Sequence, residues 1–164
     1  MRPIVSSIRA AATGVSHFLD QILRPLYNGV AHLSTFTNDI DFVRQLEAYR
    51  DRGQLLPSTL FVTFDVADLY TMIPRDGALA ALNRFLQKHA TGGKIKNMKI
   101  SILIKMVELV LDTNCFAFEN KYYRQIRGGA MGSPLTMTLA NIYMFEWEQP
   151  LIGFQKCHRE LYGR

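Results

Sequence analysis

A cluster of glycines followed directly by a long apolar stretch limits how this 164-residue chain can fold. Residues 128–134 read Gly-Gly-Ala-Met-Gly-Ser-Pro, and residues 135–147 are mostly apolar. Ser133 is a favourable N-cap residue and proline is favoured at the first helical position, so a loop should lead into a helix over about 135–147. Glycines let the backbone approach a ligand closely, and a helix N-terminus presents free N–H groups. A loop that only joins a hairpin to a helix explains the same residues, and both interpretations stay open.

The rest of the chain mixes helical and strand patterns. Apolar spacing predicts helices over 13–32, 39–51, 76–89 and 98–112. Strands are predicted over 2–6 and 60–64, and a hairpin over 114–126. Pro25 is expected to kink or end the first helix. The run at 60–64 is short, β-branched and aromatic, so we expect a buried strand there. Because strands alternate irregularly with helices and a hairpin occurs, an α+β fold is favoured over a doubly wound sheet.

The overall composition excludes several classes of protein. Hydrophobic residues make up 48% of the chain and charged residues 20%, which is typical of a packed globular core and not of a disordered chain. The most apolar stretch, 100–111, is interrupted by Lys105 and Glu108, so no membrane span is expected. The first residues lack the apolar core of a signal peptide, which predicts an intracellular protein. Cys115 and Cys157 stand far apart, which excludes a CxxC metal or redox motif.

Positive charge is concentrated in one segment. Residues 91–127 hold seven Lys and Arg residues against three Asp and Glu, whereas residues 1–90 are near balance and residues 128–164 are neutral. That segment therefore accounts for most of the net charge of +5. A concentrated basic segment suits a polyanionic partner. A solvated protein surface explains the same charges.

Two aspartates follow the predicted strand at 60–64. Asp65 and Asp68 are three residues apart and are flanked by hydrophobic residues. A carboxylate at the end of a buried strand is costly unless something pairs with it, and hard cations such as Mg²⁺ prefer carboxylate oxygens. The alternative is that Asp65 caps the turn at the end of the strand.

Together these segments carry a family resemblance. Residues 64–74, Phe-Asp-Val-Ala-Asp-Leu-Tyr-Thr-Met-Ile-Pro, resemble the first palm motif of reverse transcriptases, a hydrophobic strand that ends in a catalytic aspartate and is followed by an aromatic residue. Gly-Ala-Met-Gly-Ser-Pro-Leu at 129–135 and Ala-Asn-Ile-Tyr-Met at 140–144 look like the family's glycine-serine-proline loop and helix. Arg-Pro-Ile-Val at 2–5 resembles the arginine-bearing strand of the fingers. The resemblance covers nearly the whole chain, and the residues of its motifs are most similar to those of Penelope-like retroelements.

The resemblance implies both a fold and an activity. The fold would be a helix-rich, partial polymerase palm of the split β-α-β type over 57–164, with a remnant of the fingers over 1–56. The activity would be that of an RNA-directed DNA polymerase, which transfers nucleotides from dNTPs to the 3′-hydroxyl of a primer on an RNA or DNA template. Two Mg²⁺ ions, or Mn²⁺ in their place, would activate that hydroxyl and neutralise the leaving pyrophosphate. Copying of an element onto chromosomal DNA would place the protein in the nucleus.

The same resemblance assigns roles to the first motif. Asp65 would ligate both metal ions, and the backbone carbonyl of Val66 would contact one of them. Backbone N–H groups near Asp68 and Leu69 would hold the triphosphate of the incoming nucleotide. Tyr70 stands where the family places the side chain that stacks under the sugar and excludes a 2′-hydroxyl. An ordinary half-buried aromatic residue is the alternative for Tyr70.

The glycine segment and the N-terminal motif also receive roles by resemblance. Arg2 would bind triphosphate oxygens through charge-assisted hydrogen bonds, unless it is a frayed surface residue near the terminus. Gly129 would lie against the incoming nucleotide. Gly132, Ser133 and Pro134 would face the template and primer.

The family's second acidic motif is missing from the sequence. Reverse transcriptases need a Tyr-x-Asp-Asp hairpin beside the first aspartate, but no Asp-Asp pair occurs here and no aspartate follows Asp112. Many relatives also carry glutamine where Gly128 stands. One aspartate cannot hold two Mg²⁺ ions in octahedral geometry, so we expect an internal piece of a longer polymerase that is inactive by itself. A strand at 60–66 without its neighbour would leave an open edge, which predicts marginal stability or aggregation.

Two other functional classes fit the sequence. The chain could be a catalytically dead nucleic-acid-binding module that uses the basic segment 91–127, or a purely structural or interaction domain. Binding that weakens steeply with salt and is indifferent to Asp65 would favour the first. Absence of any nucleic-acid binding at low salt would favour the second.

Overall fold

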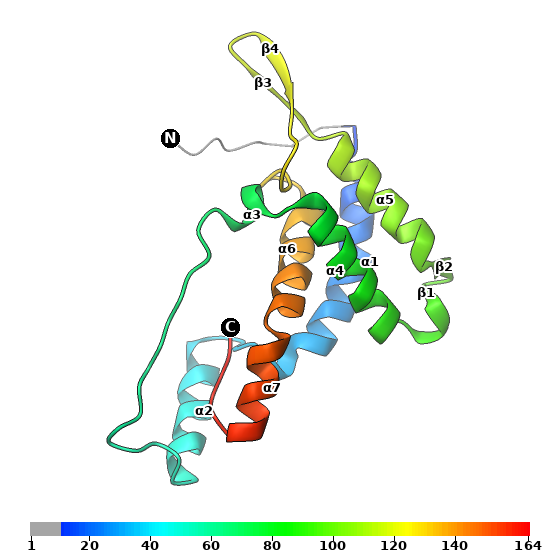
Figure 1. Ribbon diagram of the computed structural model, residues 1–164. Coiled ribbons are helices and arrows are strands. Elements are labelled where there is room, and N and C mark those ends of the chain that lie inside the picture. The colour runs from blue at the N-terminus through cyan, green and yellow to red at the C-terminus, as the bar shows by residue number, and fades with distance from the viewer. Residues whose placement is uncertain (1–10) are drawn as a thin grey trace.

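The protein, described here by a computed structural model, is built mainly from helices, with two short antiparallel sheets (Figure 1). The structure describes residues 11–164, apart from the side chain of Ala117. The helices are α1 (Thr13–Ala31), α2 (Asp39–Asp51), α3 (Leu69–Met72), α4 (Arg75–His89), α5 (Ile100–Asp112), α6 (Pro134–Trp147) and α7 (Gln149–His158). The strands are β1 (Lys94–Ile95), β2 (Met98–Lys99), β3 (Cys115–Phe118) and β4 (Lys121–Arg124). The helix-rich α+β class expected from the sequence is confirmed, while the predicted strand at 2–6 lies outside the described residues.

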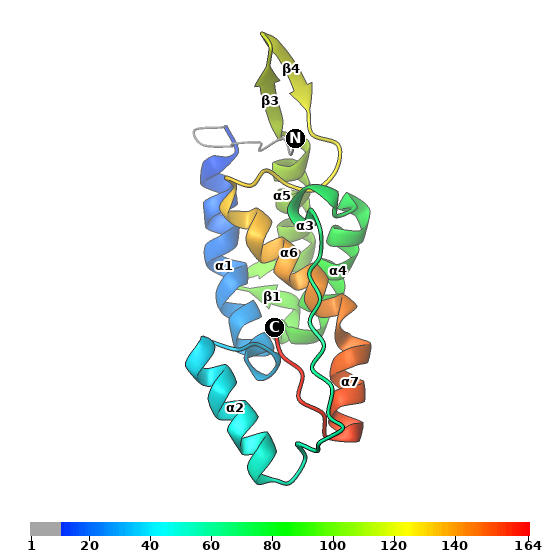
Figure 2. The ribbon, with the colours of Figure 1, turned by 90° about the vertical axis from the view of Figure 1, so that its left-hand side faces the viewer.

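Helix α6 lies at the centre of the core. It packs against α1 and α4, and α5 packs against both of those helices. Figure 2 shows α6 between α1 and α4. One apolar cluster joins the four helices, and its fully buried members include Leu23, Phe85, Leu103 and Ile142. The core therefore draws on residues from both sides of the boundary predicted at residue 56.

Buried hydrogen bonds join α1 to α6. The Thr138 hydroxyl donates to the Asp20 carboxylate at 2.5 Å, and Arg24 pairs with the same carboxylate at 2.7 Å. Ser133 occupies the N-cap position of α6 as predicted, but its side chain makes no capping bond. Instead the Ser16 hydroxyl lies 2.6 Å from the Ser133 hydroxyl and accepts a hydrogen bond from the Leu135 N–H. The N-terminus of α6 is thus capped by a residue of a neighbouring helix.

Pro25 does not end the first helix, which was one of the two effects predicted for it. Helix α1 continues through Pro25 to Ala31, and a short 3₁₀ turn, His32–Ser34, follows. Leu23 and Tyr27 are buried on either side of the proline. Their packing in the core outweighs the lost backbone hydrogen bond, because most helical stability in proteins comes from tertiary contacts.

The buried strand predicted at 60–64 is also wrong. Figure 1 shows the segment between α2 and α3 as an extended trace on the left, apart from the helices of the core. It forms no ladder with any described strand, and the side chains of Leu60 and Val62 are 85% and 81% exposed. A β-branched, aromatic run favours extended backbone, but a strand is buried only when neighbouring strands cover it. Phe64 meets Trp147 edge-on at 6.4 Å between ring centroids, and this contact ties the segment to the end of α6.

The remaining elements follow the predicted boundaries closely. Helices α2, α4 and α5 and the hairpin of β3 and β4 fall within the predicted ranges or differ by a residue or two at their ends. Helices α3 and α7 and the small pair of β1 and β2 were not predicted.

Cys115 and Cys157 are both free and exposed. Among the residues the structure describes, no helix has the length and apolar character needed to cross a membrane.

Candidate functional site

The two sequence motifs meet in space. The backbone N–H of Gly129 donates to the carbonyl oxygen of Tyr70 at 2.9 Å, and that of Gly128 donates to the carbonyl oxygen of Ile73, also at 2.9 Å. Tyr70 lies in α3, directly after the aspartates, and Ile73 ends that helix. The glycine loop is therefore bonded to the segment that follows Asp65.

Both glycines are required by this close approach. Gly128 has a φ of +60°, and a Cβ there would overlap the carbonyl oxygen of Tyr70 and lie 2.6 Å from Cα of Thr71. A Cβ at Gly129 would overlap the side chain of Thr136. A side chain at Gly128 would push the loop away from α3, and one at Gly129 would push it away from α6, because atoms cannot approach so closely.

The hairpin before the glycine loop is fixed at its base. The Arg75 guanidinium, from the first turn of α4, donates to the carbonyl oxygen of Gln125 and pairs with Asp112 at 3.2 Å. Asp112 also pairs with Arg124 at 2.8 Å. Burial lowers the pKa of Arg75 from its ordinary value. These contacts join α4, the end of α5 and the hairpin just before the chain enters the loop.

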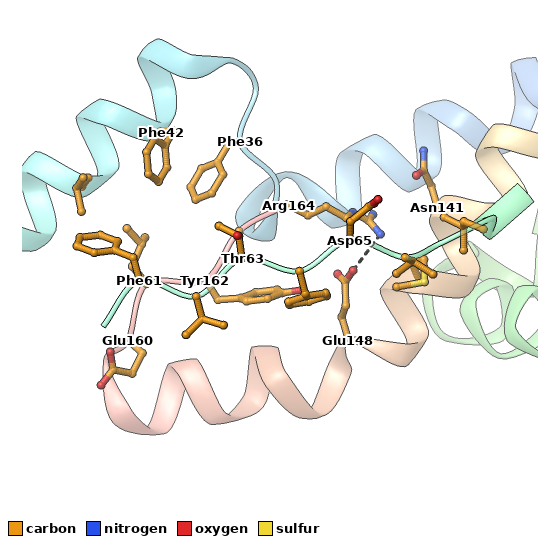
Figure 3. Close-up of a pocket in the computed structure, with 18 of the residues that line it drawn as sticks. Phe36, Phe42, Phe61, Thr63, Asp65, Asn141, Glu148, Glu160, Tyr162 and Arg164 are labelled. Atoms are coloured by element: carbon orange, nitrogen blue, oxygen red, sulfur yellow. Dashed lines mark hydrogen bonds and ion pairs between the residues drawn. The ribbon is translucent and has the colours of Figure 1, made fainter. Parts of the chain in front are cut away.

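A groove of about 700 Å³ opens beside these motifs. We define it by the extended residues 59–66, the C-terminal residues 160–164, and side chains from α2 and α6 (Figure 3). Asp65 is exposed in this groove, and Asn141 of α6 also lines it. Most of the wall is apolar and aromatic, with Phe36 and Phe42 in an edge-to-face contact at 5.1 Å.

A buried ion pair lies in the wall of the groove. Glu148, at the junction of α6 and α7, is 1% exposed and pairs with the Arg164 guanidinium at 3.2 Å (Figure 3). Arg164 also contacts the hydroxyl of Tyr27, and its backbone pairs with Ser34 and Phe36 at 3.0 and 2.8 Å. Burial raises the pKa of Glu148, although Arg164 opposes the shift. The pair holds the C-terminal residues against α1 and the start of the groove.

Tyr162 lies beside this ion pair. Burial, with the negative charge of Glu148, raises the pKa of Tyr162 to about 12. Its phenol therefore stays neutral at physiological pH. It adds a ring to the apolar wall of the groove rather than a proton donor or acceptor for chemistry at neutral pH.

The acidic residues of this chain do not fit a site for two Mg²⁺ ions. Within residues 11–164, no group of three or more His, Cys, Asp or Glu side chains converges as metal ligands. The acidic residues that line the groove are Asp65, Asp68, Glu148 and Glu160. One oxygen of Glu148 pairs with Arg164, and Glu160 accepts a hydrogen bond from the Tyr49 hydroxyl. Mg²⁺ requires near-octahedral oxygen coordination, and a two-ion site needs bridging carboxylates.

The other residues of the first motif lie between the groove and the core. Val66 is partly exposed and lines the groove beside Asp65. Asp68 precedes α3 in a left-handed conformation, and its carbonyl oxygen accepts from the N–H groups of Thr71 and Met72. Leu69 packs against the core, and Tyr70 is half-buried and lines the groove.

The glycine segment divides between surface and interior. Gly132 is exposed, and Pro134 is the half-buried first residue of α6. Ser133 is buried and its hydroxyl meets Ser16 of α1, so it points into the protein rather than toward the groove. Arg2 lies outside the described residues.

Sequence reasoning missed the polar residues that hold these parts together. Ser16, Tyr27 and Glu148 are distant in sequence from their partners, and so is Thr138, which donates to Asp20. Only the pair of Asp20 with Arg24 has a local helical spacing. Asp20 carried one usable signal, because an aspartate inside an apolar helical stripe needs a buried partner. The partner itself, Thr138, could not be found without the tertiary structure.

Comparison with protein-family models, with curated proteins and with solved structures finds no match to this chain.

Proposed function

We propose that this chain is a partial palm with a remnant of the fingers of a reverse transcriptase, and that it does not complete the metal site by itself. The observation that carries the proposal is the contact between the glycine loop and the segment after Asp65. Two motifs that resemble separate parts of a polymerase active site are joined by the hydrogen bonds from Gly128 and Gly129. The approach of Gly128 to α3 leaves no room for a side chain, so this contact depends on glycine.

The proposed roles follow from the positions of the residues. Asp65 supplies one carboxylate at the groove, with the Val66 backbone beside it. In this proposal an incoming dNTP lies against Tyr70 and Met131 of the glycine loop, which both line the groove, next to a primer and its RNA or DNA template. Because no group of acidic side chains converges around Asp65 within residues 11–164, this proposal takes further acidic ligands from outside the chain for nucleotide transfer. A retroelement that copies itself onto chromosomal DNA would carry this domain into the nucleus.

Nucleotide binding tests the proposal. The full chain is loaded with a recessed primer–template, and binding of the complementary dNTP in Mg²⁺ is measured by calorimetry. We expect Asp65→Ala to weaken binding about tenfold or more, since it removes a groove carboxylate that would ligate Mg²⁺ bound to the nucleotide. Asp76→Ala is the matched control, because Asp76 is exposed and lies outside the groove. Absence of dNTP binding, or equal binding by both variants, would overturn the proposal.

Primer extension tests the incompleteness of the metal site. We expect the chain to yield no templated product with Mg²⁺ or Mn²⁺, because the loss of one member of a catalytic unit removes most of the activity. Templated incorporation that Asp65→Ala abolishes would show that the chain holds both ions, and would contradict this part of the proposal.

A nucleic-acid-binding module without catalysis is the second candidate. The observation in its favour is that every lysine and arginine of residues 91–127 is exposed, while no group of acidic side chains converges in the described part of the chain. Binding by such a module would weaken with salt, as phosphate contacts release counterions. It would also be the same for the parent chain and for Asp65→Ala, and dNTP would not bind.

A further inference from the structure

The hairpin of β3 and β4 presents a row of aromatic rings on one of its faces. Phe116 pairs with Tyr123 and Phe118 pairs with Lys121 in the antiparallel register. Residues that lie opposite each other in such a pair point to the same side, and alternate residues of a strand share a face. Phe116, Phe118, Lys121 and Tyr123 therefore form one face, which we call the aromatic face. Tyr122 stands on the opposite face.

The aromatic face lies in solvent. Figures 1 and 2 show the hairpin projecting beyond the helices. Phe118 is 59% exposed and Tyr123 is 42% exposed. The rings of Phe116 and Tyr123 are stacked, with centroids 5.5 Å apart and planes inclined by 20°. Exposed rings in a row are unusual on a protein surface unless something covers them.

The charge on this face is positive. Lys121 is exposed between the rings and the turn, and in the described part of the chain it makes no ion pair. Arg124 points to the other side and is held by Asp112. Arg127 is exposed just beyond the hairpin, and Glu119 in the turn is the one acid of the hairpin. Flat rings beside an exposed lysine match the two parts of a nucleotide, the base and the phosphate.

We propose that the aromatic face binds single-stranded nucleic acid, with bases stacked on Phe118 and Tyr123 and a phosphate on Lys121. In taking nucleic acid as the partner, this inference rests on the proposed function. The hairpin leads through residues 125–127 into the glycine loop, and Arg75 fixes its base to α4. Single-stranded nucleic acid bound to the hairpin is therefore held next to the glycine loop and α3.

Anisotropy of short fluorescent oligouridylate and oligothymidylate measures this binding on the full chain. Loss of one stacked ring weakens binding by about fivefold to a hundredfold, so we expect this loss for Phe118→Ala and for Tyr123→Leu. Tyr123→Phe keeps the ring and should keep the affinity. Tyr122→Ala is the matched control, because Tyr122 is 88% exposed on the opposite face of the same strand. Lys121→Ala should reduce the slope of log affinity against log salt by about 0.7.

Three outcomes would overturn the inference. The first is an absence of binding at low salt. The second is an equal loss in Tyr122→Ala and Phe118→Ala, which would mean that the aromatic face is not the surface. The third is that polyglutamate competes as well as the oligonucleotide does and that binding is unchanged in the ring variants. This result would assign the surface to an acidic protein. Circular dichroism melts show whether each variant is folded, and Phe118→Ala removes only an exposed ring.

The test separates this inference from the proposed function. Asp65→Ala should bind the oligonucleotides as the parent chain does, because Asp65 is not part of the hairpin. Normal oligonucleotide binding without dNTP binding would overturn the proposed function alone. Normal dNTP binding by the hairpin variants, with unchanged oligonucleotide affinity, would overturn the hairpin inference alone.

Discussion

The N–H of Gly129 donates a 2.9 Å hydrogen bond to the carbonyl oxygen of Tyr70 and so joins the glycine loop to α3. The neighbouring Gly128 approaches the same oxygen so closely that no Cβ fits between them. This contact brings together the two sequence segments from which a function was inferred. It also makes the loop sensitive to the smallest possible substitution.

Gly128→Ala should destabilise the protein more than Gly53→Ala does. Both glycines have positive φ, at +60° and +71°, but only Gly128 is crowded by α3, whereas a Cβ at Gly53 meets nothing. The left-handed backbone alone costs about 1–2 kcal/mol, so we expect this loss at Gly53. The steric overlap should raise the loss at Gly128 to about 3 kcal/mol or more. Urea denaturation measures both, and equal losses would mean that the loop moves away from α3 at little cost.

Thr138→Val should show the value of the buried contact between α1 and α6. The hydroxyl is replaced by a methyl group of similar volume, which leaves the Asp20 carboxylate without its 2.5 Å donor. Loss of a hydrogen bond to a buried charge costs about 1.5–3 kcal/mol, or several degrees in the melting temperature. Thr138→Ser keeps the hydroxyl and should retain most of the stability. If the valine and serine variants melt together, the hydrogen bond is not the cause.

The stability of the chain should fall as the pH rises above the ordinary pKa of Glu148. Burial raises the pKa of this carboxyl in the folded protein above its ordinary value of 4.5, so the folded state binds the proton more tightly than the unfolded state. The contribution of protonated Glu148 to the free energy of unfolding is full below pH 4.5 and is lost as the pH rises through the raised pKa. Chemical denaturation between pH 4 and neutrality, in steps of about one pH unit, measures the free energy of unfolding. Its pH dependence should be shallower for Glu148→Gln than for the parent chain. An unchanged slope in that variant would assign the dependence to other groups.

The exposed apolar residues of the extended segment should make the protein self-associate. Leu60 and Val62 are more than four-fifths exposed on an unpaired, strand-like backbone, which is a typical template for intermolecular pairing. Leu60→Lys with Val62→Lys should reduce the fraction of oligomer in light scattering without lowering the melting temperature. Leu33→Lys is the control, because Leu33 is 76% exposed away from this segment. A monodisperse parent chain with a sharp melt would contradict the expectation.

Local sequence patterns were sufficient for most helices and for the hairpin. Apolar spacing depends only on the geometry of the helix, so α2, α4 and α5 could be placed within a residue or two. The strand at 60–64 could not be judged in the same way. Its residues favour extended backbone, but whether extended backbone becomes a buried strand depends on a neighbouring strand that no local pattern reveals. Pro25 does not end its helix for a related reason, since the packing of Leu23 and Tyr27 outweighs a local preference.

The candidate site divides in the same manner. The sequence alone identified Asp65, the glycine cluster and the basic segment, because unusual residue types at short spacing are visible without coordinates. Only the tertiary structure decided that Gly128 and Gly129 press against α3, that Ser133 turns inward to Ser16, and that the hairpin carries its rings on one face. These relationships join residues far apart in the chain. They are set by which surfaces can be buried together, and a sequence read locally does not contain that information.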